Sequence, residues 1–376
     1  MKKVKLGEIC EIVTGSTPKS SNPNYWNGEY KWITPAEISD DDFIVFDTQR
    51  KITKLGIEKT GLKSFPKGTV LLSSRAPIGK VAISGCEMYC NQGFKNFICS
   101  NKINNEYLYY FLKSRKNYLN ILGRGATFKE ISKSIAYDIE IFLPTYDIQR
   151  KQVKVLKKID KLIYTRKEQL IEFEHLVKSR FNEMFGDFYT TLFPKYKIGE
   201  KFELSSGSTP SRDNKLYWDS GTINWVKTTE VINKEITETE EKITKFALEN
   251  TSLKLFPVNT ILIAMYGQGQ TRGRSAILKV ESTSNQACGA IFPNEIDNPV
   301  FIWHQLMLRY SELRELGRGG NQPNLNGQLI KNFELIFPPL SLQNEFADFV
   351  AQVDKSQFAC QKAIKLWRNS LKSSII

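Results

Sequence analysis

The sequence contains one unusual phrase twice: TGSTPKSSNPNYWNG at residues 14–28 and SGSTPSRDNKLYWDS at residues 206–220. The tetrapeptide Gly-Ser-Thr-Pro and the tryptophan after it recur with a displacement of 192 residues. Further landmarks recur in the same order at displacements of 191 to 194: Ile-Thr-Lys at 52–54 and 243–245, Phe-Pro at 65–66 and 256–257, Asn-Gln at 91–92 and 285–286, and Leu-Gly-Arg-Gly at 122–125 and 316–319. This period is far longer than the roughly 20 to 50 residues of a solenoid unit. The sequence therefore predicts a tandem duplication of two whole domains.

A long stretch with helical periodicity follows each copy. Residues 148–185 contain no proline or glycine, and such a helix would extend about 57 Å, far beyond the mean globular helix of about 12 residues. Its apolar residues fall at heptad spacing, and the same register recurs 194 residues later. The seam residues are Leu156, Ile159, Ile163, Leu170 and Phe173 in the first copy and Val350, Val353, Ile364 and Trp367 in the second. Each helix could simply cover the core of its own domain. We favour an antiparallel coiled coil, because each apolar seam is then buried by the other.

Each copy itself has an α+β pattern. Strand-like runs at residues 68–72 and 259–263 follow turns that contain proline, and residues 105–119 and 299–316 predict one amphipathic helix per copy. The predicted fold class is therefore α+β: two duplicated domains, each followed by a long α-helix, with pseudo-twofold symmetry. The predicted boundaries are 1–146 for the first domain, 147–186 for the central helix, 187–340 for the second domain and 341–376 for the last helix.

The composition indicates a folded protein with a polyanionic partner. The 376 residues are 41% hydrophobic, which is enough for each domain to bury a core. No window reaches the roughly 20 apolar residues of a membrane span, and the first residues lack an apolar stretch of signal-peptide length, so we expect a cytoplasmic protein. The 53 basic and 40 acidic residues give a net charge of +13, which favours nucleic acid as the partner.

No motif predicts an active site or a bound cofactor. Gly79-Lys80 lacks the rest of a P-loop, and the glycines of residues 267–273 are spaced one residue too widely for a dinucleotide-binding fingerprint. Asn-Pro-Asn-Tyr at residues 22–25 resembles the loop with which amino-methyltransferases hold a target base, but the second copy lacks it and no glycine-rich adenosylmethionine loop precedes it. The six cysteines form no CxxC pair and are accompanied by only two histidines. The sequence therefore predicts reduced thiols and no metal site.

Three polar loops recur in each copy and are the candidates for contact with DNA. Hydroxyls, backbone N–H groups and basic side chains commonly bind phosphate oxygens, and Arg, Gln and Asn bind base edges in the major groove. The loops of the first copy contribute Ser16, Thr17, Lys19, Ser74, Arg75, Lys80, Arg124 and Thr127. Those of the second copy contribute Ser208, Thr209, Arg212, Tyr266, Gln268, Gln270, Arg272, Arg274, Arg318, Asn321 and Gln322. The copies differ most at these polar tips, as expected if they read different base sequences, although neutral loop drift would give the same pattern.

The ordered set of motifs, present twice, resembles the specificity subunit of Type I restriction-modification systems. The set runs from GSTP and Tyr-Trp through a tryptophan before Glu37 or Glu230, a Phe-Pro turn, Asn-Gln and a Pro-to-Gln step into the long helix, and it covers essentially the whole chain. The resemblance implies two target-recognition domains, separated by paired helices, that each read one half of a split double-stranded DNA target. It also implies two methyltransferase subunits, which bring adenosylmethionine and the catalytic loop, and ATP-dependent restriction subunits. This chain would then be a non-catalytic subunit without a cofactor of its own.

Two other interpretations stay open from the residues alone. A self-sufficient methyltransferase or nuclease would modify DNA unaided, and a coiled-coil scaffold or protein-binding subunit would show no salt-sensitive affinity for DNA. Residues 148–185 carry ten Lys or Arg against five acids, which fits a solvated face as well as phosphate contact across an unread gap. If the resemblance holds, the paired helices set the spacing of the half-sites, because modules on one face of DNA lie about one helical turn of 34 Å, or a multiple of it, apart.

Overall fold

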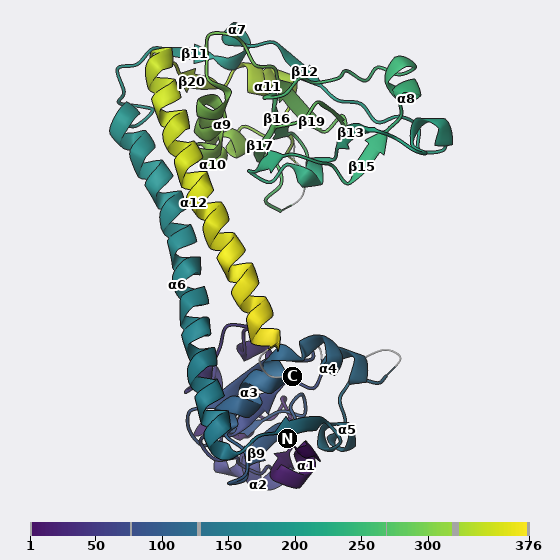
Figure 1. Cartoon of the computed structure of the whole chain (residues 1–376), viewed down its shortest axis with the longest axis vertical. Coiled ribbons are helices and arrows are strands. Elements are labelled where there is room, and N and C mark those ends of the chain that lie inside the picture. The colour runs from purple at the N-terminus through teal and green to yellow at the C-terminus, as the bar shows by residue number, and fades with distance from the viewer. Residues whose placement is uncertain (1, 76, 126–128, 268, 318–322, 374–376) are drawn as a thin grey trace. The chain divides into compact units, whose positions relative to one another are not determined.

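The computed structural model describes residues 2–75, 77–125, 129–267, 269–317 and 323–373, which fold as two compact units (Figure 1). Unit 1 comprises Met1–Gln169 with Cys360–Ile376, and unit 2 comprises Leu170–Ala359. Each unit combines a domain of short strands and helices with parts of two long helices, α6 (Tyr146–Phe185) and α12 (Leu340–Ser373). Within these described ranges, no helix is long and apolar enough to cross a membrane.

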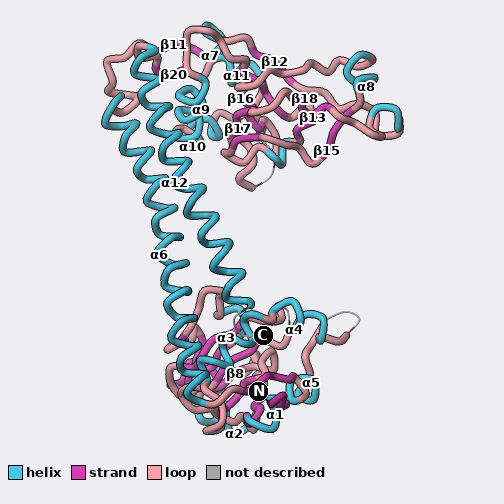
Figure 2. The backbone as a smooth tube through the Cα atoms, in the orientation of Figure 1, coloured by secondary structure: helices cyan, strands magenta, loops and turns pink. Residues whose placement is uncertain are grey.

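The domain of unit 1 contains two sheets and a separate strand pair, shown as magenta strands in Figure 2. The five-stranded sheet has the order β2-β9-β6-β7-β4, and the three-stranded sheet has the order β5-β3-β8. The strand β1 pairs antiparallel with β10. The bounds of these strands are β1 Lys2–Lys5, β2 Cys10–Val13, β3 Trp26–Ile33, β4 Ile44–Val45, β5 Arg50–Ile52, β6 Val70–Leu72, β7 Val81–Ser84, β8 Tyr89–Cys90, β9 Asn96–Cys99 and β10 Glu140–Leu143.

The domain of unit 2 repeats this topology strand for strand. Its sheets have the orders β12-β19-β16-β17-β14 and β15-β13-β18, and β11 pairs with β20. The bounds are β11 Lys195–Lys197, β12 Leu204–Ser206, β13 Ile223–Val226, β14 Glu235–Ile236, β15 Glu241–Ile243, β16 Ile261–Ala264, β17 Ser275–Leu278, β18 Ser282–Ser284, β19 Cys288–Ile291 and β20 Glu334–Ile336. The pairing directions also match, because β4 runs parallel to β7 as β14 does to β17. The duplication predicted from sequence is therefore a duplication of fold.

Short helices complete both domains. In unit 1 they are α1 Leu6–Ile9, α2 Lys54–Thr60, α3 Asn105–Ser114, α4 Lys116–Leu122 and α5 Lys133–Tyr137. In unit 2 they are α7 Ile198–Lys201, α8 Lys245–Glu249, α9 Pro299–Leu308, α10 Tyr310–Glu315 and α11 Gly327–Lys331. The single amphipathic helix predicted in each copy is wrong in detail, because it is two helices. Arg115 (φ −106°, ψ 22°) and Arg309 (φ −103°, ψ 25°) leave helical geometry and separate them.

The long helices pack together in antiparallel fashion, as predicted. In unit 1 the first part of α6 meets the last part of α12, and Leu156 lies in the same apolar cluster as Leu371. In unit 2 the last part of α6 meets the first part of α12, where the ring of Phe181 packs edge to face on that of Phe346 at 5.4 Å. All nine predicted seam residues are buried or half-buried. Because the start of each helix packs against the end of the other, the two helices run in opposite directions.

The helices also cover the cores of their own domains, so both interpretations of the heptad pattern are correct. Val153 and Leu156 belong to the core cluster of unit 1 that contains Leu6, Phe97 and Leu108. In unit 2 the corresponding face of α12 contributes buried apolar side chains to the core around β16 and α9. Burying an apolar side chain of this size stabilises a fold by about 1.5–3 kcal/mol. Each helix is therefore fixed to a domain as well as to its partner helix.

Candidate nucleic-acid interface

The first predicted loop of unit 1 is held by two tryptophans on β3. Trp26 and Trp32 pack edge to face with ring centroids 5.0 Å apart. The indole N–H of Trp32 donates to the carbonyl of Ser16 at 3.1 Å, and that of Trp26 donates to the carbonyl of Lys19 at 3.3 Å. A buried indole requires an acceptor for its N–H. The aromatic pair therefore fixes the backbone of the loop at two points.

Unit 2 holds its first loop at the same two positions. Trp218 and Trp225 also pack edge to face at 5.0 Å. Their indole N–H groups donate to the carbonyls of Ser211 and Ser208, each at 3.0 Å. Both acceptor positions are displaced by 192 residues from those of unit 1, so the tryptophan brace is part of the duplicated frame.

The glycine that opens each GSTP phrase is required by close packing. A Cβ on Gly15 would lie 1.8 Å from the carbonyl oxygen of Cys90, and one on Gly207 would lie 2.0 Å from that of Ser284. These separations are far inside van der Waals contact, and the obstacle is backbone that has no freedom to rotate away. The phrase therefore begins with glycine because the loop runs directly over the end of β8 or β18.

The threonine of each GSTP phrase is paired with the glutamine of the recurring Asn-Gln dipeptide. The hydroxyl of Thr17 donates to Oε1 of Gln92 at 2.6 Å, and Thr209 makes the same bond to Gln286. A hydroxyl has one proton to donate. Donation from either threonine to a phosphate oxygen would therefore require this bond to open.

The other predicted residues of the first loops are at or near the surface. Lys19 and Arg212 are exposed, and Ser16 and Ser208 are half-buried. The hydroxyl of Ser208 lies 3.1 Å from that of Ser252. Of this set, Lys19 is the best placed for a contact with DNA, because Arg212 is ion-paired with Glu241.

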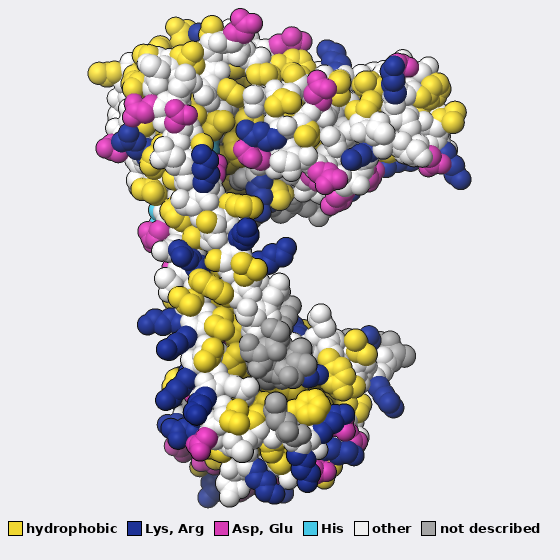
Figure 3. Space-filling model, viewed as in Figure 1, with side chains coloured by type: hydrophobic (Ala, Val, Ile, Leu, Met, Phe, Trp, Pro, Cys, Tyr) yellow, Lys and Arg dark blue, Asp and Glu magenta, His cyan; other side chains and the backbone are white. Residues whose placement is uncertain are grey.

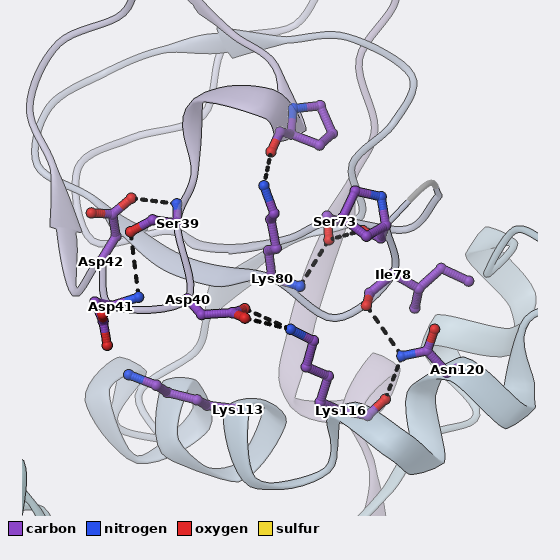
Figure 4. Close-up of polar contacts among 12 residues, drawn as sticks. Ser39, Asp40, Asp41, Asp42, Ser73, Ile78, Lys80, Lys113, Lys116 and Asn120 are labelled. Atoms are coloured by element: carbon purple, nitrogen blue, oxygen red, sulfur yellow. Dashed lines mark hydrogen bonds and ion pairs between the residues drawn. The ribbon is translucent and has the colours of Figure 1, made fainter. Parts of the chain in front are cut away.

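The second loop of unit 1 is fixed by contacts at its base (Figure 4). Nζ of Lys80 donates to the carbonyl of Pro35 at 3.1 Å. From α4, Nδ2 of Asn120 donates to the carbonyl of Ile78 at 3.2 Å. Lys80 is therefore half-buried and engaged with the protein rather than extended into solvent.

Ser74, Arg75 and Arg124 surround an ion pair. Nζ of Lys95 lies 3.0 Å from Oε1 of Glu130 and donates to the hydroxyl of Ser74 at 3.3 Å. Ser74 is fully buried, so it belongs to the interior and does not present its hydroxyl to a ligand. Nε of Arg75 lies 3.7 Å from the same carboxylate, and the backbone of Arg124 pairs with that of Glu130. One glutamate thus joins the second and third loops of unit 1.

The longer second loop of unit 2 is held from α10. Arg314 donates to the carbonyls of Gly269 and Arg272 at 2.5 and 3.0 Å, and the hydroxyl of Tyr310 donates to the carbonyl of Gln270 at 2.7 Å. Arg314 is displaced by 194 residues from Asn120, which has this role in unit 1. The arginine is the longer side chain, and it reaches a loop with three additional residues.

Arg272 and Arg274 have different surroundings although both lie on this loop. Arg272 is half-buried and donates from Nη1 to the carbonyl of Pro323. Arg274 donates from Nη2 to Oε1 of Gln270, on its own loop, at 2.9 Å. The structure thus favours a bracing role for Arg272, whereas Arg274, which directly precedes β17, pairs with Gln270 within the loop.

A pocket of about 460 Å³ in unit 2 lies between β12, the start of the second loop and α11. Tyr266, which is 40% exposed, lies on one side of it. The pocket is lined by Leu204, Ser205, Ser206, Met265, Tyr266, Gln286, Asn326, Gly327, Gln328 and Lys331. The second predicted loop of unit 2 therefore borders a recess rather than a flat surface.

Five predicted contacts lie outside the described residues. They are Thr127, Gln268, Arg318, Asn321 and Gln322.

On the face shown in Figure 3, Lys and Arg side chains gather over unit 1 and along α6. A surface with this excess of cations attracts a polyanion.

Several residues that organise the loops were not predicted from the sequence. Lys95, Glu130, Tyr310 and Arg314 brace them, and Arg50 lies over the tryptophan pair of unit 1. The correspondence of Asn120 with Arg314 was available from the repeat. The ion pair was not, because Lys95 and Glu130 come together only through the fold.

Burial shifts the pKa values of two thiols and one imidazole among the described residues. Over the described ranges, no three His, Cys, Asp or Glu side chains come together as a metal-ligand set. Burial raises the pKa of the Cys90 and Cys288 thiols to about 12, so both stay protonated and unreactive at neutral pH. Burial lowers the pKa of His304 to about 4, which leaves the imidazole neutral inside the core of unit 2.

Comparison with known proteins agrees with this arrangement. The family model of the Type I restriction modification DNA specificity domain matches twice, at residues 1–174 and 192–366. The Type I restriction enzyme MjaIX specificity subunit of Methanocaldococcus jannaschii is 29% identical over 96% of this chain and 88% of its own length. The EcoR124I/EcoR124II specificity subunit of Escherichia coli is 26% identical over 42% of this chain and 40% of its own.

Solved structures share the fold at low sequence identity. The S subunit of the Type I restriction-modification system of M. genitalium aligns over 100% of this chain and 96% of its own, with a TM-score of 0.58 and 15% identity. A chain from a structure of the assembly and conformational transition of a type I R-M system aligns over 99% and 94%, with a TM-score of 0.67 and 17% identity. With the duplicated family match covering nearly the whole sequence, the chain belongs to the Type I restriction-modification DNA specificity family.

Proposed function

We propose that this chain is the subunit that recognises a two-part DNA sequence and directs methyltransferase and restriction subunits to it. The observation that carries the proposal is the repetition of one loop frame with different polar tips. The tryptophan brace, the glycine contact and the Thr-Gln pair occur in both units. The side chains that project from this frame differ in kind and number. Two domains that recognise different half-sites need the same loop backbone with different side chains on it, because base edges are distinguished by the chemistry of the side chains that contact them.

The paired helices provide the proposed spacer. A bipartite target has specified base pairs on either side of an unread gap, and the two readers must reach successive major grooves. Each long helix is anchored in a domain core and along its partner helix. We propose that this rigid pair sets the length of the gap. Lengthening both helices by one heptad is then expected to widen it.

We propose that the methylation and cleavage reactions are carried out by partner subunits. Methyltransferase subunits, two of them if each half-site is served by one, would bring adenosylmethionine, and restriction subunits would bring the ATP-dependent nuclease. The described residues of this chain would then supply only positioning. A complex that lacks this chain is expected to retain its catalytic residues and lose its target.

Exchange of one domain tests the proposal directly. Residues 1–146 are replaced by those of another family member, and methylated adenines are mapped in a host that carries the complex. One half of the target is expected to change while the other half and the gap stay the same. A control exchange of residues 187–340 should change the opposite half. A change of both halves in either exchange would refute independent reading.

A further inference from the structure

One segment has the same backbone in both units and opposite charge. In unit 1 it is residues 48–51, Thr-Gln-Arg-Lys, and in unit 2 it is residues 239–242, Thr-Glu-Glu-Lys. The first segment has two cations and no acid, and the second has two acids and one cation. Both lie at the start of the strand that flanks the tryptophan-bearing strand, β5 beside β3 and β15 beside β13.

The hydrogen bonds show that the two segments are structurally equivalent. The hydroxyl of Thr48 donates to the carbonyl of Arg50 at 2.7 Å, and that of Thr239 donates to the carbonyl of Glu241 at 2.6 Å. In the strand registers, Arg50 is opposite Trp32 just as Glu241 is opposite Trp225. The charge reversal is therefore a difference of side chain on one fixed frame.

A guanidinium nevertheless covers the tryptophan pair in both units. In unit 1 it is that of Arg50, whose Cζ lies 3.5 Å from the ring centre of Trp26. In unit 2 it is that of Arg212, whose Cζ lies 3.8 Å from the ring centre of Trp218. Arg212 comes from the first loop, and the matching residue of unit 1 is Ser20. The two units thus place the same cation on the same rings from different positions in the sequence.

The two guanidinium groups differ in their neutralisation. Arg212 forms an ion pair with Glu241, and Nζ of Lys227 lies 3.3 Å from the other carboxylate oxygen of Glu241. These cations hold the pKa of Glu241 below its ordinary value, so the acid is charged at neutral pH. Arg50 is exposed, and among the described residues no carboxylate lies within ion-pair distance of it. A stacked guanidinium keeps its N–H groups directed outward in the plane of the group, where they match two oxygens of a phosphate.

Arg50 also lies beside the loop proposed to contact DNA. The rings that it covers are those whose N–H groups hold the carbonyls of Ser16 and Lys19. A single indole ring, that of Trp26, therefore separates Arg50 from the backbone of the first loop of unit 1. Lys19, which is exposed on that loop, adds a second cation on the same side of the domain.

We propose that Arg50 binds a backbone phosphate of the DNA next to the half-site read by unit 1, and that Glu241 removes the equivalent contact from unit 2. This inference rests on the proposed function. It implies that the two halves of the target are held unequally, with a phosphate anchor on one side only. Arg212 in turn serves as a brace of the tryptophan pair rather than as a phosphate contact.

The test is the salt dependence of binding by the full chain to a DNA duplex of mixed sequence, between about 50 and 200 mM salt. Each phosphate contact contributes about 0.9 to the slope of log K against log salt. Arg50→Ala is expected to lower the slope by about that amount and to weaken binding about fivefold at 0.15 M salt. Arg50→Lys keeps the charge and should keep most of the slope. Glu241→Gln should raise the slope, because it leaves the charge of Arg212 uncompensated.

Lys51→Ala is the matched control. It removes the same charge from the neighbouring position of β5, whose side chain points to the opposite face of the strand. The control should leave the slope unchanged. An equal fall for Lys51→Ala and Arg50→Ala, or an unchanged slope for both Arg50→Ala and Glu241→Gln, would overturn the inference.

The outcomes also separate this inference from the proposed function. If the unaltered chain shows no salt-sensitive binding to DNA, the proposed function itself fails. If it binds and Arg50→Ala binds with the same slope, only the phosphate anchor fails. If thermal unfolding shows that Arg50→Ala does not fold, the salt dependence of Glu241→Gln tests the inference instead, because that variant leaves the stacking of Arg212 on the tryptophan rings in place.

Discussion

Arg166 on α6 and Cys360 on α12 are 194 residues apart, the period of the duplication, and their side chains meet: Nη1 of Arg166 lies 3.8 Å from Sγ of Cys360. Two positions related by an internal repeat contact each other only where the symmetry axis of the repeated elements passes between them. The antiparallel pairing of the two helices is therefore centred here. The seam is polar at its centre, since Oε1 of Gln169 also lies 3.9 Å from the same sulfur.

We predict that Arg166→Leu stabilises the helix pair. A polar group at a seam position fixes register at a cost in stability, so an apolar side chain here should raise the free energy of unfolding by about 1 kcal/mol. Thermal unfolding measures the change. The matched control is Arg180→Leu, two heptads later at the same position of the register, where the arginine is ion-paired with Glu183 and Glu345 at 2.9 and 2.8 Å. Loss of these ion pairs should offset the gain, and equal stabilisation by both variants would show that the polar contact at Arg166 is not what costs stability.

Gly207→Ala should damage the first loop of unit 2. The new Cβ would lie 2.0 Å from the carbonyl oxygen of Ser284, and inserting a methyl group into such a contact typically costs about 1–3 kcal/mol. Gly327→Ala is the control, because a Cβ there meets nothing within 4 Å. Chemical denaturation of both variants should show a loss for Gly207→Ala that exceeds the loss for Gly327→Ala. DNA affinity should fall with it, since the loop carries the proposed contacts.

Arg272→Ala and Arg274→Ala should weaken DNA binding in different ways. Arg272 joins the second loop to Pro323, so its removal should loosen the loop and reduce affinity for all sequences. Among the described residues, Arg274 bonds through its side chain only to Gln270 of its own loop, and its removal should reduce affinity by about 1–3 kcal/mol for the preferred half-site and less for others. Competition binding against duplexes altered in one half-site distinguishes the two patterns. A base-dependent loss for Arg272→Ala would instead assign that residue to base readout.

The stability of unit 2 should fall as the pH is lowered from 7 to 5. The ring of His304 packs between those of Trp303 and Phe346, at 5.4 and 5.5 Å, and burial lowers the pKa of its imidazole to about 4. In the unfolded chain the His304 imidazole has an ordinary pKa of about 6.5, so it is protonated at pH values where the folded unit keeps it neutral. Stability is complete above pH 6.5 and declines toward pH 4, by about 2 kcal/mol at pH 5.

A histidine variant checks this origin. His304→Gln should remove that part of the pH dependence, measured by chemical denaturation at pH 7 and pH 5. His175→Gln, which changes an exposed histidine on α6, should leave the dependence intact. A pH dependence that survives His304→Gln would place its source elsewhere.

The repeat and the heptads were enough to determine the architecture of this protein. Landmarks spaced by 191 to 194 residues required two copies of one fold, and the copies indeed share strand order and pairing direction. The seam from Leu156 to Trp367 required partner helices, because apolar residues at strict heptad spacing must be covered. Both conclusions follow from local periodicity and from repetition, which are properties of the linear sequence.

The roles of individual polar residues were decided only by the tertiary structure. Ser74 and Ser16 were both predicted to contact phosphate because of their hydroxyl groups, but the fold buries Ser74 beside Lys95. Arg212 and Arg50 are equivalent in charge, but among the described residues only Arg212 is ion-paired, with Glu241, whose position is set by strand pairing. Whether a charged side chain is neutralised or available depends on partners that are distant in sequence. The sequence therefore determined that this chain has two equivalent DNA specificity domains, while packing between remote segments decided which of their polar side chains are neutralised and which are exposed.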